Sequence, residues 1–165
     1  MKKQIFLMAL AITALSVKGI SQAATANTSH SVSLSLTNLM SISFTAGGAG
    51  VTMNFSTASD YTNGVTSANA ATLSVQSNRN YNVTVKSSSA NFSSTAATTM
   101  PVNNVLYVKE SNQTTFTNLS TTDQTLLSNQ TKGTATINVD YKATPGLNYD
   151  AGTYTATVVY TATQL

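Results

Sequence analysis

Residues 153–163 read Thr-Tyr-Thr-Ala-Thr-Val-Val-Tyr-Thr-Ala-Thr, and this stretch decides the fold class. Apolar side chains occupy every second position of it: Tyr154, Ala156, Val158, Tyr160 and Ala162. A period of two is typical of a β-strand with one face in a core and the other in water. Thr and Val are β-branched, so they fit a pleated sheet better than a helix. The stretch therefore predicts a long, half-buried strand.

The same alternation recurs upstream, in residues 32–36, 41–45, 51–55, 72–76, 81–86 and 136–141. Residues 105–108 are more continuously apolar and predict a strand that is covered on both faces. With the final stretch this makes eight expected strands, separated by segments rich in Gly, Asn and Pro. Such spacing predicts an all-β fold, an Ig-like β-sandwich of about seven to nine antiparallel strands.

Two connections are short enough to suggest hairpins. Asn78-Arg79-Asn80 links two alternating runs, and residues 46–50 (Ala-Gly-Gly-Ala-Gly) form another turn-rich link. The best position for a short helix is 123–128, because no other segment approaches a helical period.

The first 23 residues match the plan of a secretory signal peptide of bacterial type. Lys2 and Lys3 precede the apolar run Ile5–Val17, and Ser21 and Ala23 are small residues at the −3 and −1 positions of a cleavage site. Cleavage after Ala24 or Ala26 also fits. The apolar run has 13 residues, too few to cross a bilayer. We therefore expect export to the periplasm, the cell surface or the medium, with no stable membrane span in the mature chain.

After the leader, residues 24–31 are small and polar and predict a flexible lead-in, followed by a single β-sandwich domain over 32–165. The remaining charges are few and balanced, five Lys or Arg against five Asp or Glu. So few cations argue against a nucleic-acid partner, which needs clustered positive charge. Ser, Thr and Asn are abundant instead (21, 29 and 16 residues). A neutral, uncharged sheet offers little repulsion against self-association.

No motif for catalysis, a cofactor or a metal is present. The chain has no cysteine, and its single histidine, His30, lies in the lead-in without partners. The acids have no calcium-loop spacing, and Asp140 falls on the face of its strand that we expect to be exposed. We predict no enzymatic activity, no cofactor and no metal. A pair of carboxylates that meets only in the folded protein stays open as an alternative.

Tyrosines outside the strands are candidates for ligand binding. Tyr61, Tyr107 and Tyr149 are not fixed on the apolar side of a strand, and exposed aromatic rings can stack on sugars. These three residues are the possible ligand aromatics of a glycan-binding module.

Val32, Leu34 and Leu36 alternate with serines close to the start of the mature chain. They fit two interpretations. The segment is the first strand of a complete domain, or it is a donor strand that fills a groove in another molecule by β-strand addition. The complete domain is the simpler interpretation, and both remain open from sequence.

Residues 151–160 follow the pattern A-G-T-Y-x-x-x-V-x-Y, and 73–92 contain Ser77-Asn78 followed by Tyr-Asn-Val-Thr-Val. These segments resemble two kinds of bacterial surface β-sandwich: the WxL-type domains and the cysteine-free alternate chaperone–usher pilins. The Trp-x-Leu motif of the first and the cysteine pair of common type 1-like pilins are both missing. The resemblance implies an Ig-like sandwich at the cell surface.

Together these observations predict an exported, non-enzymatic structural or adhesion protein of the cell surface, with a fimbrial subunit as one form. Its partners would be copies of itself or other surface proteins. The alternative is a secreted module that binds carbohydrate or protein.

Overall fold

The computed structural model describes residues 24–165, so the expected signal peptide (1–23) lies outside the described residues. The chain divides into two units, Met1–Ser35 and Leu36–Leu165. In the first unit, residues 24–35 form neither helix nor strand, and their side chains are exposed. All the secondary structure of the described chain belongs to the second unit.

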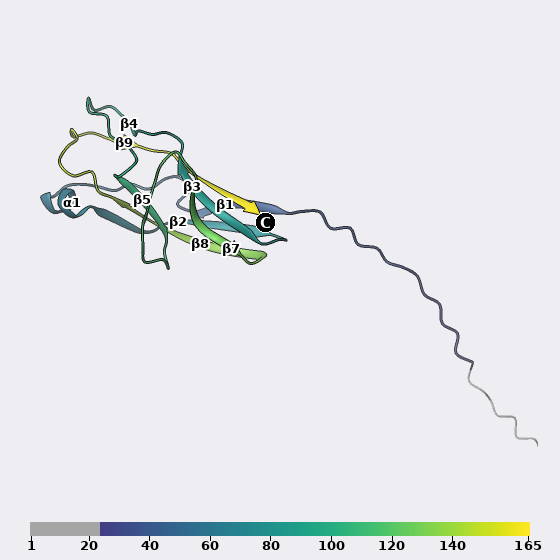
Figure 1. The fold of residues 1–165 in the computed structure, drawn as a ribbon. Helices are drawn as coiled ribbons and strands as arrows, with labels where there is room; N and C mark the ends of the chain where they lie inside the picture. The colour runs from purple at the N-terminus through teal and green to yellow at the C-terminus, as the bar shows by residue number, and fades with distance from the viewer. Residues whose placement is uncertain (1–23) are drawn as a thin grey trace, which may run out of the picture. The chain divides into compact units, whose positions relative to one another are not determined.

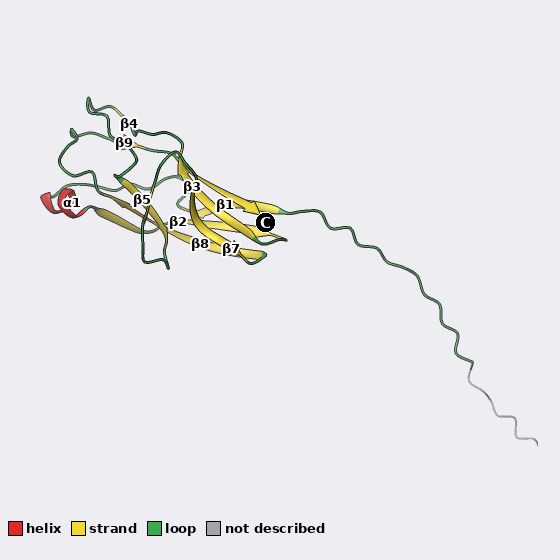
Figure 2. Cartoon of the chain, viewed as in Figure 1, coloured by secondary structure: helices red, strands yellow, loops and turns green. Residues whose placement is uncertain are grey.

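The secondary structure of the second unit is almost wholly β-strand, joined by loops and turns (Figure 2). In chain order its elements are β1 (Met40–Ala46), α1 (Ala58–Asn63), β2 (Val65–Ser77), β3 (Tyr81–Ser87), β4 (Ser93–Ser94), β5 (Leu106–Glu110), β6 (Thr117–Asn118), β7 (Gln124–Gln130), β8 (Gly133–Ala143), β9 (Tyr154–Thr155) and β10 (Val158–Gln164).

The strands form three antiparallel sheets (Figure 1). The largest has the order β1-β2-β8-β5-β6, the second has the order β10-β3-β7, and β4 pairs with β9. Inward-facing residues of both larger sheets share one core, with Leu73 and Val75 from β2 beside Val83 and Val85 from β3. The architecture is therefore an all-β, sandwich-like fold with one short helix in the described residues. Figure 1 shows α1 and the β4–β9 pair at one end of this unit and the C-terminus at the other.

The link Asn78-Arg79-Asn80 is not a hairpin, because β2 and β3 belong to different sheets. Ser77 Oγ donates a hydrogen bond to the Arg79 carbonyl over 2.6 Å, which tightens the turn. Both flanking strands direct apolar rows into the core, so the chain passes from one layer of the sandwich to the other. Residues 46–50 also do not close a hairpin, since β1 pairs only with β2.

Three further expectations about local structure were wrong. Residues 123–128 fall largely in β7, where pairing with β3 overrides the weak local preference. The helix of the described chain is α1, which a capping box between Thr57 and Asp60 starts. Residues 32–36 form no strand, so β1 is the first strand of the domain.

Asp140 is buried rather than exposed, with 6% of its surface accessible. Lys109 of the neighbouring strand β5 covers it with an ion pair of 2.9 Å, and Ser111 Oγ and the Asn69 N–H donate to Oδ1 over 2.6 and 2.8 Å. Burial raises the pKa of Asp140, but the hydrogen bonds of Ser111, Lys109 and Asn69 outweigh it and lower the pKa to about 2. The carboxylate is thus a fixed charge that joins β5, β8 and the irregular middle of β2.

Within residues 24–165, no helix combines the length and the hydropathy that a bilayer crossing requires. The same residues hold no group of three His, Cys, Asp or Glu side chains that could bind a metal ion.

Candidate functional site

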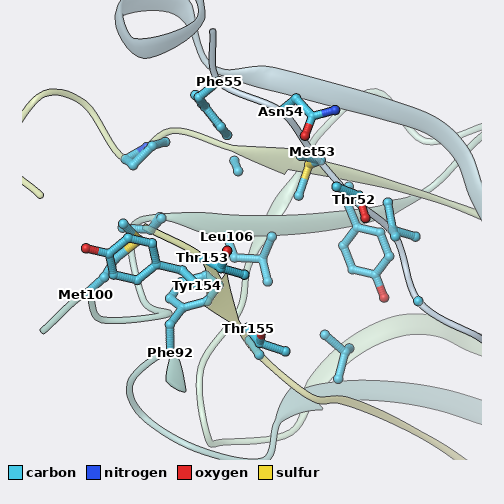
Figure 3. A pocket seen from close by; sticks show the side chains of 18 of the residues that line it. Thr52, Met53, Asn54, Phe55, Phe92, Met100, Leu106, Thr153, Tyr154 and Thr155 are labelled. Carbon is cyan, nitrogen blue, oxygen red and sulfur yellow. The ribbon is translucent and has the colours of Figure 1, made fainter. Parts of the chain in front are cut away.

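A groove of about 1110 Å³ opens at the end of the sandwich that carries α1, between residues 51–56 and residues 153–158 (Figure 3). It exceeds the ordinary size range of small-molecule pockets, about 300–1,000 Å³. Met53 and Phe55 point into it from one rim, and Tyr154 lies on the opposite side.

The first rim is an extended segment that has no strand partner. In residues 51–56 the half-buried Val51, Met53 and Phe55 alternate with exposed Thr52, Asn54 and Ser56. Within residues 24–165, no hydrogen bond reaches the backbone of 51–54. The strand predicted at 51–55 is wrong: burial alternates along the segment, but it pairs with no other strand. Backbone groups beside a core normally find partners, so an extended rim without them is unusual.

A glycine turn places the first rim. Gly47 has φ +72°, and a Cβ there would lie 2.3 Å from the Ala70 carbonyl oxygen. The Gly50 N–H donates to the Gly47 carbonyl over 3.0 Å and completes the turn. The chain therefore passes directly over β2 before it becomes the rim.

The N-terminus of α1 fixes the other end of this rim. The N–H groups of Ser56 and Thr57 donate to Asp60 Oδ2 over 2.9 and 2.8 Å. These backbone hydrogen bonds, that of Ser56 first, lower the pKa of Asp60. Rim residues 51–56 are thus held at both ends and left unpaired between them.

The second rim runs through β9 into β10. Ser93 and Ser94 of β4 pair with Thr155 and Tyr154. The Tyr154 ring meets Phe92 edge-on, with centroids 6.4 Å apart, and its hydroxyl donates to the Asp150 carbonyl over 2.9 Å. This rim is anchored on its outer side, while its inner side faces the groove.

The floor of the groove is the hydrophobic core itself, because buried residues of β2, β5 and β8 line it: Ala71, Leu106, Tyr141 and Ala143, with Val105 just before β5. Tyr141 and Tyr160 join the two larger sheets through their hydroxyl oxygens, 2.5 Å apart. Burial raises the pKa of both phenols, so both stay neutral.

Apolar side chains of the second sheet are buried to different degrees at its centre and at its β10 edge. Val83 and Val85 at the centre of the second sheet are fully buried. The inward-facing row of β10, Val158, Tyr160 and Ala162, is only half-buried, and Phe44 of β1 is 46% exposed. On this flank, therefore, a row of apolar side chains on β10 and Phe44 on β1 keep part of their surface in contact with solvent.

Among the residues that line the groove, Asp150 alone carries a charge at neutral pH, and its carboxylate accepts a hydrogen bond from Thr98. The groove therefore suits an uncharged occupant.

The structure separates the three candidate tyrosines. Tyr61 and Tyr149 both line the groove, whereas Tyr107 lies on β5 outside it and donates to the Asn104 carbonyl over 3.2 Å. The Tyr61 ring packs on Phe55, with centroids 5.5 Å apart. The three residues do not form one aromatic platform.

The candidate donor residues are highly exposed: Val32 by 75%, Leu34 by 85% and Leu36 by 88%.

The sequence did not predict the groove. Alternation in 51–55 was the available signal for one rim, but nothing in the sequence marks Phe92 or Met100 as lining residues.

The chain enters the domain at the opposite end from the groove. Asn78 Nδ2 donates to the Thr37 carbonyl over 2.7 Å, and Gln164 Nε2 donates to the Leu39 carbonyl, also over 2.7 Å. Residues 37–39 are therefore fixed beside the C-terminal end of β10 (Figure 1).

No protein-family model matches this chain, and no curated protein matches it at a significant level.

Proposed function

We propose that this protein is an exported structural subunit of a cell-surface filament, and that its domain is an Ig-like sandwich that lacks one strand. Residues 32–36 of one copy supply that strand to the groove of the next copy. The mode of contact is β-strand addition, in which backbone pairing gives affinity and alternate side chains fill pockets.

One observation carries the proposal: the groove lies over the hydrophobic core between two strand-like rims, and one of these rims has an unpaired backbone. A strand inserted there would cover the floor with its apolar side chains and pair its backbone with residues 51–56 or with β10. A small ligand would leave the backbone of the rim unpaired.

Residues 32–36 match the groove in length, period and charge. At about 3.3 Å per residue, a six-residue rim is about 17 Å long and the five-residue segment about 13 Å. Val32, Leu34 and Leu36 would face the floor, and Ser33 and Ser35 would face water. Residues 31–37 carry no charged side chain, which suits a groove with a single carboxylate.

The residues that follow the segment, 37–39, are fixed at the end of the domain opposite α1. Thr37 and Leu39 are held beside Gln164, and the groove begins at Val158, six residues back along β10 and about 20 Å away. Leu36, Leu34 and Val32 are one, three and five residues from the fixed Thr37, so their reach is at most about 3.6, 11 and 18 Å. We therefore assign the occupant of the groove to a second copy.

A contact between the segment of one copy and the groove of another is heterologous, so it continues from copy to copy and builds an open chain. Burial of each Val or Leu side chain contributes about 1.5–3 kcal/mol. Three such side chains give the contact a substantial driving force before the cost of ordering the segment.

A deletion of residues 24–36 tests the proposal. We expect a mature protein that keeps its β-sheet circular dichroism and cooperative unfolding but forms no filaments by electron microscopy. A synthetic peptide of residues 24–36 should then bind it and raise its melting temperature. Deletion of 24–30 is the matched control and should leave assembly intact.

If the deletion variant is unfolded, residues 24–36 are needed for the fold of their own domain, and the proposal is contradicted. A folded variant that assembles normally would contradict the proposal.

Glycan binding in the same groove is the second candidate, supported by Tyr61 and Tyr149 in its lining. Its prediction differs: a glycan array would show binding that is lost on Tyr61→Ala or Tyr149→Ala and kept after deletion of residues 24–36.

A further inference from the structure

Two side chains act on the backbone of residues 37–39 as a neighbouring strand would. Asn78 Oδ1 accepts a hydrogen bond from the Leu39 N–H over 2.9 Å, and its Nδ2 donates to the Thr37 carbonyl over 2.7 Å. The amide side chain thus pairs with the N–H of one residue and the carbonyl of the residue two positions earlier, as the backbone of a neighbouring strand would.

Gln164 completes this contact from the last strand. Its Nε2 donates to the Leu39 carbonyl over 2.7 Å, to Ser77 Oγ over 3.1 Å and to Asn78 Oδ1 over 3.2 Å. The backbone N–H of Asn78 also donates to the Leu39 carbonyl, over 3.2 Å. Residues 37–39 are therefore tied to the β2–β3 turn and to the end of β10 at once.

The position of this contact gives it a role beyond the stability of the domain. It holds the residues immediately after Leu36, where the compact unit begins. In the proposed filament, those residues join a segment seated in one copy to the domain of the next. Free residues at this joint would act as a flexible linker.

We infer that Asn78 and Gln164 are positioning residues that clamp Thr37–Leu39 and so fix the angle between successive subunits of the filament. The inference rests on the proposed assembly. The clamp makes the joint stiff although residues 37–39 have no strand of their own.

Hydrogen exchange of the Leu39 amide in the mature chain tests the clamp itself. In Asn78→Ala we expect this amide to exchange at least about tenfold faster, while amides of β3 keep their rates. An unchanged Leu39 rate would overturn the inference.

Persistence length of the filaments, measured by electron microscopy, tests its consequence. Asn78→Ala and Gln164→Ala filaments should be at least about twofold more flexible than wild type at the same melting temperature of the domain. Gln164→Glu should behave like Gln164→Ala, because all three hydrogen bonds of the Gln164 side chain need its N–H groups. Gln76→Ala, an exposed change on β2, is the matched control.

The outcomes separate the two proposals. A wild-type chain that forms no filament contradicts the proposed function. If the wild type forms filaments and the variant filaments are equally stiff, the clamp is contradicted but the proposed assembly is not. Filaments of Gln164→Glu as stiff as those of the wild type would have the same meaning.

Discussion

Gly47 sits where β1 ends and the chain crosses β2 toward the groove. Its φ is +72°, and a Cβ at this position would approach the Ala70 carbonyl oxygen to 2.3 Å, which leaves no room for a side chain. Gly50 also has positive φ, at +107°, but a Cβ there meets nothing within 4 Å. A side chain at Gly47 would therefore meet both backbone strain and a steric clash, whereas a side chain at Gly50 would meet strain alone.

Gly47→Ala should lower the free energy of unfolding by at least about 2 kcal/mol, since it combines the clash with the strain. Gly50→Ala should cost about 1 kcal/mol, from strain alone. Urea unfolding of the two variants measures both values, and equal losses would contradict this account of the turn.

Asp140 makes the free energy of unfolding depend on pH, with a sign that follows from its pKa. Its pKa is about 2 in the folded protein, below the ordinary value of 3.8, because the hydrogen bonds from Ser111, Lys109 and Asn69 outweigh burial. A lowered folded pKa contributes stability above about pH 4, and that stability is lost as the pH falls toward 2.

Asp140→Asn should therefore lower the free energy of unfolding by about 2 kcal/mol at pH 7, with a much smaller difference near pH 2. Urea unfolding at the two pH values checks this. A loss of equal size at both would place the effect in packing rather than in charge.

At the scale of elements, the half-buried apolar rows of β10 and of residues 51–55 are the two surfaces that the proposed additional strand would cover. Leu34 is the central apolar residue of the segment proposed to supply it. Leu34→Ser should remove about 1.5–3 kcal/mol of burial and raise the critical concentration for filament assembly by about 10- to 100-fold.

Sedimentation of assembled protein measures that concentration. Leu147→Ser is the matched control, because Leu147 is 78% exposed and lies outside the groove lining. An equal effect of both changes would mean that general surface hydrophobicity drives assembly.

Alternation in the sequence predicts β3 and β10 well, because each turns one face toward the core and a period of two records that burial directly. It cannot distinguish a hairpin from a link between two layers, so the hairpin predicted at Asn78-Arg79-Asn80 is wrong. It also predicts a strand at 51–55 without revealing that no partner strand is present.

Burial that depends on distant residues is likewise invisible in a local pattern. The alternation of its strand predicts Asp140 in water, but Lys109, 31 positions earlier in the chain, covers it. The floor of the groove combines β2, β5 and β8, whose positions side by side follow from sheet order. Only the rim at 51–55 and the tyrosines Tyr61 and Tyr149 carried a local signal.

At the scale of the whole molecule, the proposal assigns the donor segment and the acceptor groove to different copies, because residues 37–39 are fixed at the end of the domain opposite the groove. The described chain is nearly uncharged over the groove and the segment, so association meets little electrostatic opposition. These features together favour an open series of copies rather than a closed monomer.

The absence of cysteine from the sequence allows the most direct test. One mature copy carries Leu34→Cys and a second carries Met53→Cys, at the centre of the first rim. A disulfide needs Cα atoms about 4.4–6.8 Å apart, so it reports insertion of one copy's segment into the other's groove. Leu147→Cys replaces Leu34→Cys as the control partner.

Non-reducing electrophoresis of the oxidised mixture reads out the result. We predict a disulfide-linked pair of Leu34→Cys with Met53→Cys in high yield, and little product with the Leu147→Cys control. No enrichment over the control, in a mixture whose wild-type chain assembles, would contradict donation of residues 32–36 to the groove of a second copy.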